Sequence, residues 1–148
     1  MSRNRKKNHY SPKSFEAIGQ KFKGIHGAMM ADTSATIFES MLQSDAFKSL
    51  NPKQQILYVY CKAQYYGKRK PEKDYPDIPQ FEGADLFYFN WDIAQEYGLY
   101  KPSCNKNFRN DMQALIQHGF IEIVASGKAQ HKKNIYKFSS KWKTWDSS

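Results

Sequence analysis

The sequence has few cysteines and no long apolar run. Only Cys61 and Cys104 occur among the 148 residues, without metal-ligand spacing, so we expect two reduced thiols in a cytoplasmic protein. No stretch approaches the roughly eighteen apolar residues that a transmembrane helix needs. The basic N-terminus is not followed by an apolar stretch. The sequence therefore predicts neither a membrane span nor a secretory signal.

The sequence also lacks a recognisable catalytic set. Its four histidines fall in four different segments, at His9, His26, His118 and His131. Asp74 and Asp77 stand in a proline-rich loop, without the close carboxylate geometry that metal catalysis requires. There is no glycine-rich phosphate loop. Tyr65 and Tyr66 could suggest a nicking tyrosine, but no paired-histidine metal site accompanies them. We predict no enzymatic activity, no cofactor and no bound metal.

Acidic residues are scarce at both ends of the chain, whose net charge is +9. Residues 1–30 carry seven Lys/Arg against one acid, and residues 101–148 carry nine against three. Residues 31–100 carry seven Lys/Arg against ten acids. Two basic regions flanking an acidic middle are typical of a protein that contacts phosphates. A generic solubilising charge is the alternative interpretation.

The stretch from Phe87 to Phe138 organises the rest of the sequence. It opens on the apolar residues 86–89, and Asn90 is placed to cap a helix over 91–97 that Gly98 ends. A second helix is predicted from Pro102-Ser103 to about residue 118, followed by Gly119. Two strands are expected at 120–124 and 134–138, joined by a basic loop over 125–133. This order predicts an α+β fold: a mostly helical winged helix-turn-helix domain with a small antiparallel sheet, the wing hairpin.

Three elements are expected before Asn51. Spacing of Phe15, Ile18 and Phe22 favours a short helix followed by an extended crossing up to Gly27. Residues 32–34 could cap a helix whose apolar face is Ile37, Phe38, Met41 and Leu42. Residues 45–50 are predicted to form a short turn that buries Phe47 and Leu50.

The strongest helix start in the sequence is at Asn51. Pro52 follows at the first helical position, and Gln54 can complete a capping box. The helix is predicted to run to about Tyr66 before Gly67. Its expected core stripe is Ile56, Val59, Tyr60 and Ala63, widened by Leu57 and Tyr58.

The domain organisation follows from these elements. We expect a flexible basic arm over residues 1–13, in which Arg3 and Arg5 could contact DNA, or which simply solubilises the chain. Residues 14–148 are predicted to form a single domain. Within it, residues 68–83 contain three prolines and are expected to form an exposed loop.

The helix predicted over 103–118 has one apolar and one polar face. At about 100° per residue, Phe108, Met112, Leu115 and Ile116 share one arc. The opposite arc holds Lys106, Asn110, Gln113 and Gln117, with Arg109 on its flank, and Asp111 falls near the edge of the buried side. Lys and Arg match guanine and Asn and Gln match adenine in a major groove. Ser103 and Asn105 could add phosphate contacts. An ordinary solvated face is the alternative.

The loop between the last two predicted strands favours DNA contact over an ordinary solvated surface. It carries Lys128, His131, Lys132 and Lys133, and it is longer than the two residues a minimal hairpin needs. Three lysines at its tip repel one another unless a polyanion offsets the repulsion. We therefore predict phosphate contacts there.

Three segments of the sequence resemble a known family. They are Phe89-Asn90-Trp91 with Tyr97-Gly98-Leu99-Tyr100, residues 114–122, and Asn134-Ile135-Tyr136 with Ser139-Ser140-Lys141-Trp142. Residues 41–50 add a segment similar to the pattern L-x-S-x-A-[FWY]-x-x-L. Together they resemble winged-helix proteins of bacterial phages, plasmids and conjugative elements over about residues 28–143. The resemblance implies a replication-initiator-like or regulator-like role. Full-length initiators carry a second winged-helix domain that this sequence does not contain, so such a role would require dimerisation.

The sequence thus predicts a binder of double-stranded DNA, either a transcriptional regulator or a replication or maintenance factor of a mobile element. A protein-interaction module and an RNA-binding adaptor are the alternatives. A homodimer and an unidentified protein partner are left open, and no membrane association is expected.

Overall fold

The chain divides into two units, Met1–Thr33 and Ser34–Ser148. The computed structural model describes residues 21–23, 27, 29–31, 35–64, 86–125 and 134–147. In the first unit, strand β1 (Lys21–Lys23) pairs antiparallel with β2 (Met29–Ala31), with Phe22 opposite Met30. The prediction that Phe22 lies on a helix is therefore wrong. Gly27, between the two strands, has φ +82°, a conformation that glycine adopts without strain. The boundary expected at residue 13 stays a prediction.

The second unit begins with two short helices, α1 (Glu39–Leu42) and α2 (Asp45–Ser49). The helix predicted from a cap at 32–34 instead starts at Glu39, so that Phe38 lies before it and is 67% exposed. Ser44 supplies the stronger cap, because its Oγ accepts the Phe47 N–H of α2 at 3.1 Å. Phe47 and Leu50 are buried as predicted, although α2 is helical rather than a simple turn.

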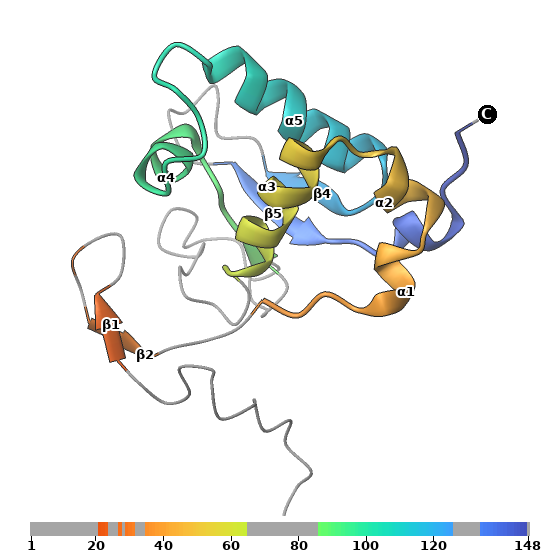
Figure 1. Ribbon diagram of the computed structural model, residues 1–148, viewed down its shortest axis with the longest axis horizontal. Coiled ribbons are helices and arrows are strands. Elements are labelled where there is room, and N and C mark those ends of the chain that lie inside the picture. The colour runs from red at the N-terminus through yellow and green to blue at the C-terminus, as the bar shows by residue number, and fades with distance from the viewer. Residues whose placement is uncertain are drawn as a thin grey trace, which may run out of the picture. The chain divides into compact units, whose positions relative to one another are not determined.

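Helix α3 (Pro52–Lys62) begins where the sequence indicates. Asn51 accepts the Gln54 N–H at 2.9 Å, and Gln54 accepts the Asn51 N–H at 3.0 Å, which completes the capping box. The helix ends at Lys62, before the predicted end at residue 66. Figure 1 shows this helix, labelled α3.

The buried face of α3 matches the predicted stripe only at Leu57 and Tyr58. Leu57, Tyr58 and Cys61 are buried, whereas Ile56 and Val59 are 47% and 39% exposed. Tyr60 and Ala63, also assigned to the core stripe, are half-buried. Both faces of this helix are apolar, so its periodicity could not select one. On the buried face, the Tyr58 ring packs against Phe120, with 5.1 Å between the ring centroids.

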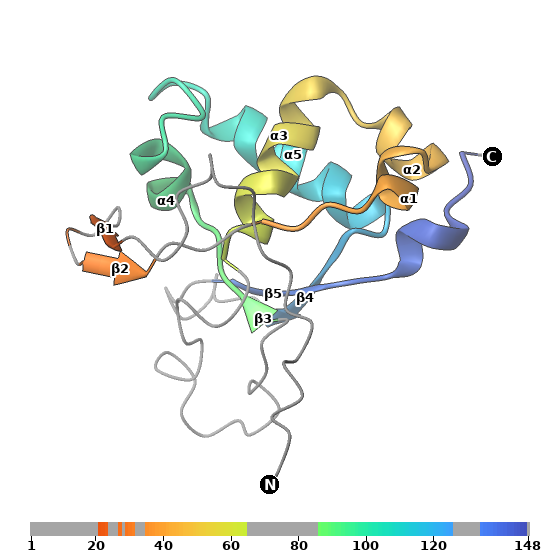
Figure 2. The same ribbon diagram turned by 60° about the horizontal axis from the view of Figure 1, so that its bottom comes forward.

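Three short strands form one antiparallel sheet. They are β3 (Leu86–Phe87), β4 (Ile121–Ala125) and β5 (Ile135–Phe138), in the order β3-β5-β4. Both strand pairs are antiparallel, with an irregularity in the β4–β5 register between Ile123 and Ala125. Figure 2 shows the sheet beneath helices α3, α4 (Trp91–Glu96) and α5 (Asn105–Gln117), so that the core lies between one helical layer and one face of the sheet.

Helices α4 (Trp91–Glu96) and α5 (Asn105–Gln117) follow β3 and precede β4. Asn90 accepts the Ile93 N–H at 3.0 Å, as its position predicts. Gly98 ends α4 at φ +72°, a conformation that other residues rarely adopt. Helix α5 starts at Asn105, later than expected, because Pro102 and Ser103 form a turn.

The chain returns to the end of α5 in a short 3₁₀ helix, η4 (Lys141–Thr144). Trp142 stacks on Phe120 with an interplanar angle of 5°, and Trp145 stacks on His118 at 4.5 Å between centroids. Both tryptophans therefore pack on the protein. Helix η4 also lies against α2, as Figures 1 and 2 both show.

Candidate nucleic-acid interface

The outward face of α5 consists of exposed polar and basic side chains. Phe108, Met112 and Leu115 point into the core and are buried, and Ile116 is half-buried. The candidate residues on the opposite arc are all exposed: Lys106, Arg109, Asn110, Gln113 and Gln117. The amphipathic pattern thus places four predicted site residues, Lys106, Arg109, Asn110 and Gln113, on one accessible surface.

The only acid of α5 is turned away from that surface. Asp111 is 8% exposed, and its two carboxylate oxygens accept hydrogen bonds from Tyr100 Oη at 2.7 Å and Gln54 Nε2 at 3.2 Å. Burial, together with the hydrogen bond to Asp111, raises the pKa of Tyr100 above its usual range, so this hydroxyl remains a donor. The outward arc of α5 consequently presents no carboxylate.

The start of α5 differs from the predicted one in a way that affects two site residues. Ser103 is exposed but lies in the turn before the helix, and Asn105 is exposed at the first helical position. Cys104, predicted within the helix, occupies the N-cap and makes no side-chain hydrogen bond to the first turn. Ser103 therefore stands beside the helix terminus rather than on its face.

Two lysines that the sequence analysis did not select lie near this turn. Lys53, on α3, donates through Nζ to the carbonyl oxygen of Leu99 at 2.6 Å. Lys101 is exposed within the turn itself. Both line a groove of about 600 Å³ that Asn107 and Asn110 of α5 also line. Residues 53 and 101 are far apart in the sequence and belong to no common sequence pattern. The packing of α3 against α5 brings them together.

The base of the hairpin between β4 and β5 is described, with Ala125 paired to Ile135. The predicted wing residues Lys128, His131, Lys132 and Lys133 lie outside the described residues, as do Arg3 and Arg5 of the predicted arm. Their phosphate contacts stay predictions.

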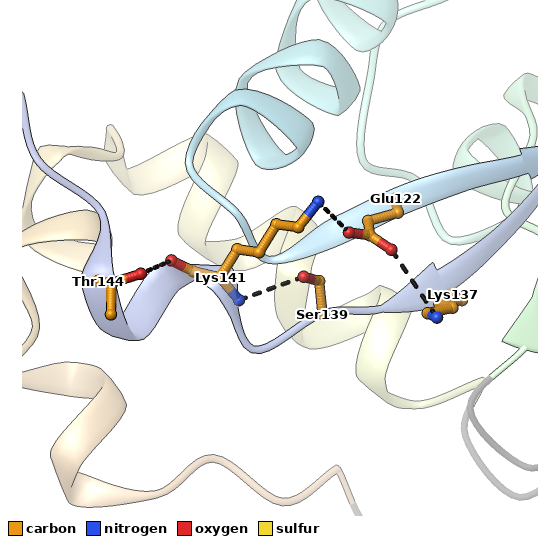
Figure 3. A network of polar contacts seen from close by, with 5 residues as sticks. All are labelled: Glu122, Lys137, Ser139, Lys141 and Thr144. Carbon is orange, nitrogen blue, oxygen red and sulfur yellow. Dashed lines mark hydrogen bonds and ion pairs between the residues drawn. The ribbon is translucent and has the colours of Figure 1, made fainter.

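A glutamate on β4 offsets part of the positive charge of two nearby lysines. Glu122 of β4 accepts Lys141 Nζ at 2.6 Å and lies 3.9 Å from Lys137 Nζ, as Figure 3 shows. The hydrogen bond from Lys141 is the main cause that lowers the pKa of Glu122 below its usual range. Lys137 and Lys141 thus share one negative charge, which partly neutralises their two positive charges.

The remaining sequence-predicted features concern metals and membranes. Cys61 is buried, and this burial raises the pKa of its thiol. Among the described residues, no cluster of three or more His, Cys, Asp or Glu side chains is arranged to hold a metal ion. Within the same part of the chain, no helix has the length and apolar character needed to cross a bilayer.

Comparison with known proteins does not assign a family or a function to this surface. No protein-family model matches the chain, and neither a curated protein nor a solved structure shows significant similarity to it.

Proposed function

We propose that this protein is a winged helix-turn-helix protein that binds duplex DNA without catalysing a reaction. The observation that carries the proposal is the composition of the exposed arc of α5. It combines Lys106 and Arg109 with Asn110 and Gln113, while Asp111 is buried on the other side. These side chains are the types that read base edges in a major groove, and the arc contains no acid to repel phosphates.

The order of the elements supports this proposal. Strand β3 precedes helices α4 and α5, which are joined by residues 97–104, and strands β4 and β5 follow α5. A helix-turn-helix of this kind places its second helix in the major groove. The hairpin leads into the basic segment over 126–133, which would lie beside the duplex as a wing.

The first test is duplex binding by fluorescence anisotropy at low and moderate salt. We expect affinity to fall steeply as salt rises, because lysine–phosphate contacts release counterions. Lys132→Ala combined with Lys133→Ala should weaken binding to all sequences alike and flatten the salt dependence. Lys48→Ala, which removes one charge from α2, measures the loss per unit of net charge, and twice that loss is the reference for the double variant. No binding of the full chain at low salt would refute the proposal.

A second prediction separates sequence preference from charge. Arg109→Ala is expected to weaken binding to a selected site by about 1–3 kcal/mol, because bidentate guanine contacts are lost. Asn110→Ala should have an effect of the same size through the loss of an adenine contact. Sites would first be selected from a random duplex pool, and affinities then compared with those for a scrambled duplex.

Arg109→Lys provides the matched control. It keeps the charge but loses the planar fork, so binding to scrambled DNA should be retained while the preference for the selected site falls. An equal loss for Arg109→Ala on selected and scrambled duplexes would assign this residue to phosphate contact instead.

The biological role that we propose is transcriptional regulation, or replication and maintenance, of a mobile genetic element. This role is supported by the resemblance of residues 41–50 and of three segments within residues 89–142 to proteins of phages, plasmids and conjugative elements. Binding specificity for a repeated site would favour replication, whereas a single site near a promoter would favour regulation.

The alternative is a protein-interaction module, and one observation favours it. The exposed Ile56 and Val59 share a face of α3 with Pro52 and Ala63, at alternating spacings of four and three residues. This is the spacing of a helix–helix seam. If the face pairs with a second copy, sedimentation should show a dimer that Ile56→Glu with Val59→Glu converts to monomer. A wild-type protein that is monomeric at all concentrations would exclude self-association through α3.

A further inference from the structure

The groove between α3 and α5 has the polar lining expected of a phosphate-binding surface. It lies where the N-terminal end of α3 meets the turn that precedes α5, and its volume is about 600 Å³. The side chains that matter here are Asn51, Lys53, Lys101, Asn107 and Asn110. Helices α3 and α5 are in contact along this side, so the groove is formed by two packed elements.

The charge of Lys53 is held in place at this groove. Its Nζ donates one hydrogen bond to the Leu99 carbonyl oxygen at 2.6 Å and lies 5.1 Å from the centre of the Tyr100 ring. An ammonium group has three donors, so this hydrogen bond leaves two for a ligand. A lysine that is already ordered loses less conformational entropy when an anion binds than a fully mobile one.

The local balance of charge favours an anion. Lys53 and Lys101 bring two positive charges to the lining, and Asp111 brings one negative charge. The two oxygens of Asp111 already accept hydrogen bonds from Tyr100 and Gln54. The asparagine amides provide further donors, and the positive end of the α5 helix dipole lies at the same place.

The groove is continuous with the proposed DNA-reading surface. Asn110 belongs both to the outward arc of α5 and to the lining of the groove. A duplex whose major groove receives α5 would therefore bring a strand of its backbone against the α3 side of that helix. We infer that Lys53 and Lys101 bind a backbone phosphate of duplex DNA in this groove and fix the position of α5 on the duplex. The inference rests on the proposed function.

The experiment compares salt dependence of binding to one duplex of about 20 base pairs. Each of Lys53→Ala and Lys101→Ala is expected to weaken binding about five-fold at low salt and to reduce the slope of log affinity against log salt by about one. The preference for a selected site over a scrambled one should not change, since phosphates carry no sequence information. Lys48→Ala is the control of equal charge on α2.

Two further measurements keep the result interpretable. Lys53→Arg should restore most of the affinity, because the charge is retained at the groove. Thermal unfolding of each variant shows whether loss of the Leu99 contact alters the fold, and Lys101→Ala tests the groove independently of that contact.

The possible outcomes separate the inference from the proposed function. If the unmodified chain binds DNA with a steep salt dependence but neither variant changes the slope, the groove does not hold a phosphate. Equal losses for Lys48→Ala, Lys53→Ala and Lys101→Ala would likewise reduce the effect to net charge and overturn the inference. If the unmodified chain does not bind DNA, the proposed function itself fails.

Discussion

Replacing Gly119 with alanine is expected to lower the free energy of unfolding by about 4 kcal/mol, because two penalties add. Gly119 has φ +82°, a left-handed conformation in which a side chain is strained. A Cβ at this position would lie 2.6 Å from the Trp142 nitrogen and 2.7 Å from the Lys141 carbonyl carbon. Both are backbone atoms, which cannot move aside as a flexible side chain would.

The chain supplies a matched control at Gly98. Its φ of +72° imposes a similar conformational penalty, but an added Cβ would meet no atom within 4 Å. Gly98→Ala should therefore cost only about 1–2 kcal/mol. Urea denaturation of both variants measures the difference, which isolates the steric contribution of η4. Equal destabilisation by the two substitutions would show that the C-terminal segment moves away without cost.

The close approach of backbone atoms at Gly119 comes from the packing of the C-terminal segment on the end of α5. The Gly119 carbonyl oxygen accepts the Trp142 N–H at 3.0 Å, and the Phe120 carbonyl oxygen accepts the Ser139 N–H at 2.9 Å. These bonds hold η4 against the C-terminal end of α5, with Trp142 on Phe120. A glycine at this position is thus required by the docking of a distant segment as well as by the helix end.

Helix boundaries set by local chemistry were predictable from the sequence. Asn51 with Gln54, and Asn90, mark helix starts through side-chain bonds to residues three positions away, and both occur as expected. Gly98 and Gly119 mark helix ends for an equally local reason. The two longer strands were also predicted within one residue. These features depend on a few neighbouring residues and little on tertiary packing.

Choices that depend on tertiary packing were not predictable in the same way. Helix α3 has two apolar faces, and the sequence does not say which one meets Phe120; the predicted stripe through Ile56 and Val59 was wrong. The start of the helix expected after residues 32–34 was also predicted too early, because the helix begins at Glu39 without a side-chain cap. Phe22 was assigned to a helix, but it pairs with Met30 in a strand.

The candidate interface shows the same division. The exposed arc of α5 follows from one amphipathic helix with a strong pattern, and its four principal residues lie where the sequence places them. Lys53 was missed because it stands on α3, far from residues 101–113 in sequence. The burial of Asp111 was indicated by its place on the helix, but its two partners come from separate segments.

Asp111→Ala is expected to lower the free energy of unfolding by about 3 kcal/mol, since the buried Tyr100 hydroxyl and the half-buried Gln54 amide would lose their acceptor. The carboxylate joins three elements. One oxygen accepts Tyr100 Oη from the turn before α5, and the other accepts Nε2 of Gln54 on α3. Gln54 in turn accepts the Asn51 N–H in the capping box. Removing the carboxylate therefore leaves two donors unsatisfied and loosens the start of α3.

A double-mutant cycle with Tyr100→Phe tests this assignment. Tyr100→Phe alone should cost about 1–2 kcal/mol, and the double variant should be more stable than the sum of the two losses predicts, because one hydrogen bond is removed in both. Chemical denaturation at constant pH gives the three free energies. Strict additivity would show that Asp111 and Tyr100 act independently.

The folded Asp111→Ala variant should retain its preference for a selected duplex, since Asp111 is absent from the exposed arc of α5. Loss of that preference in the folded state would show that the carboxylate also sets the orientation of α5.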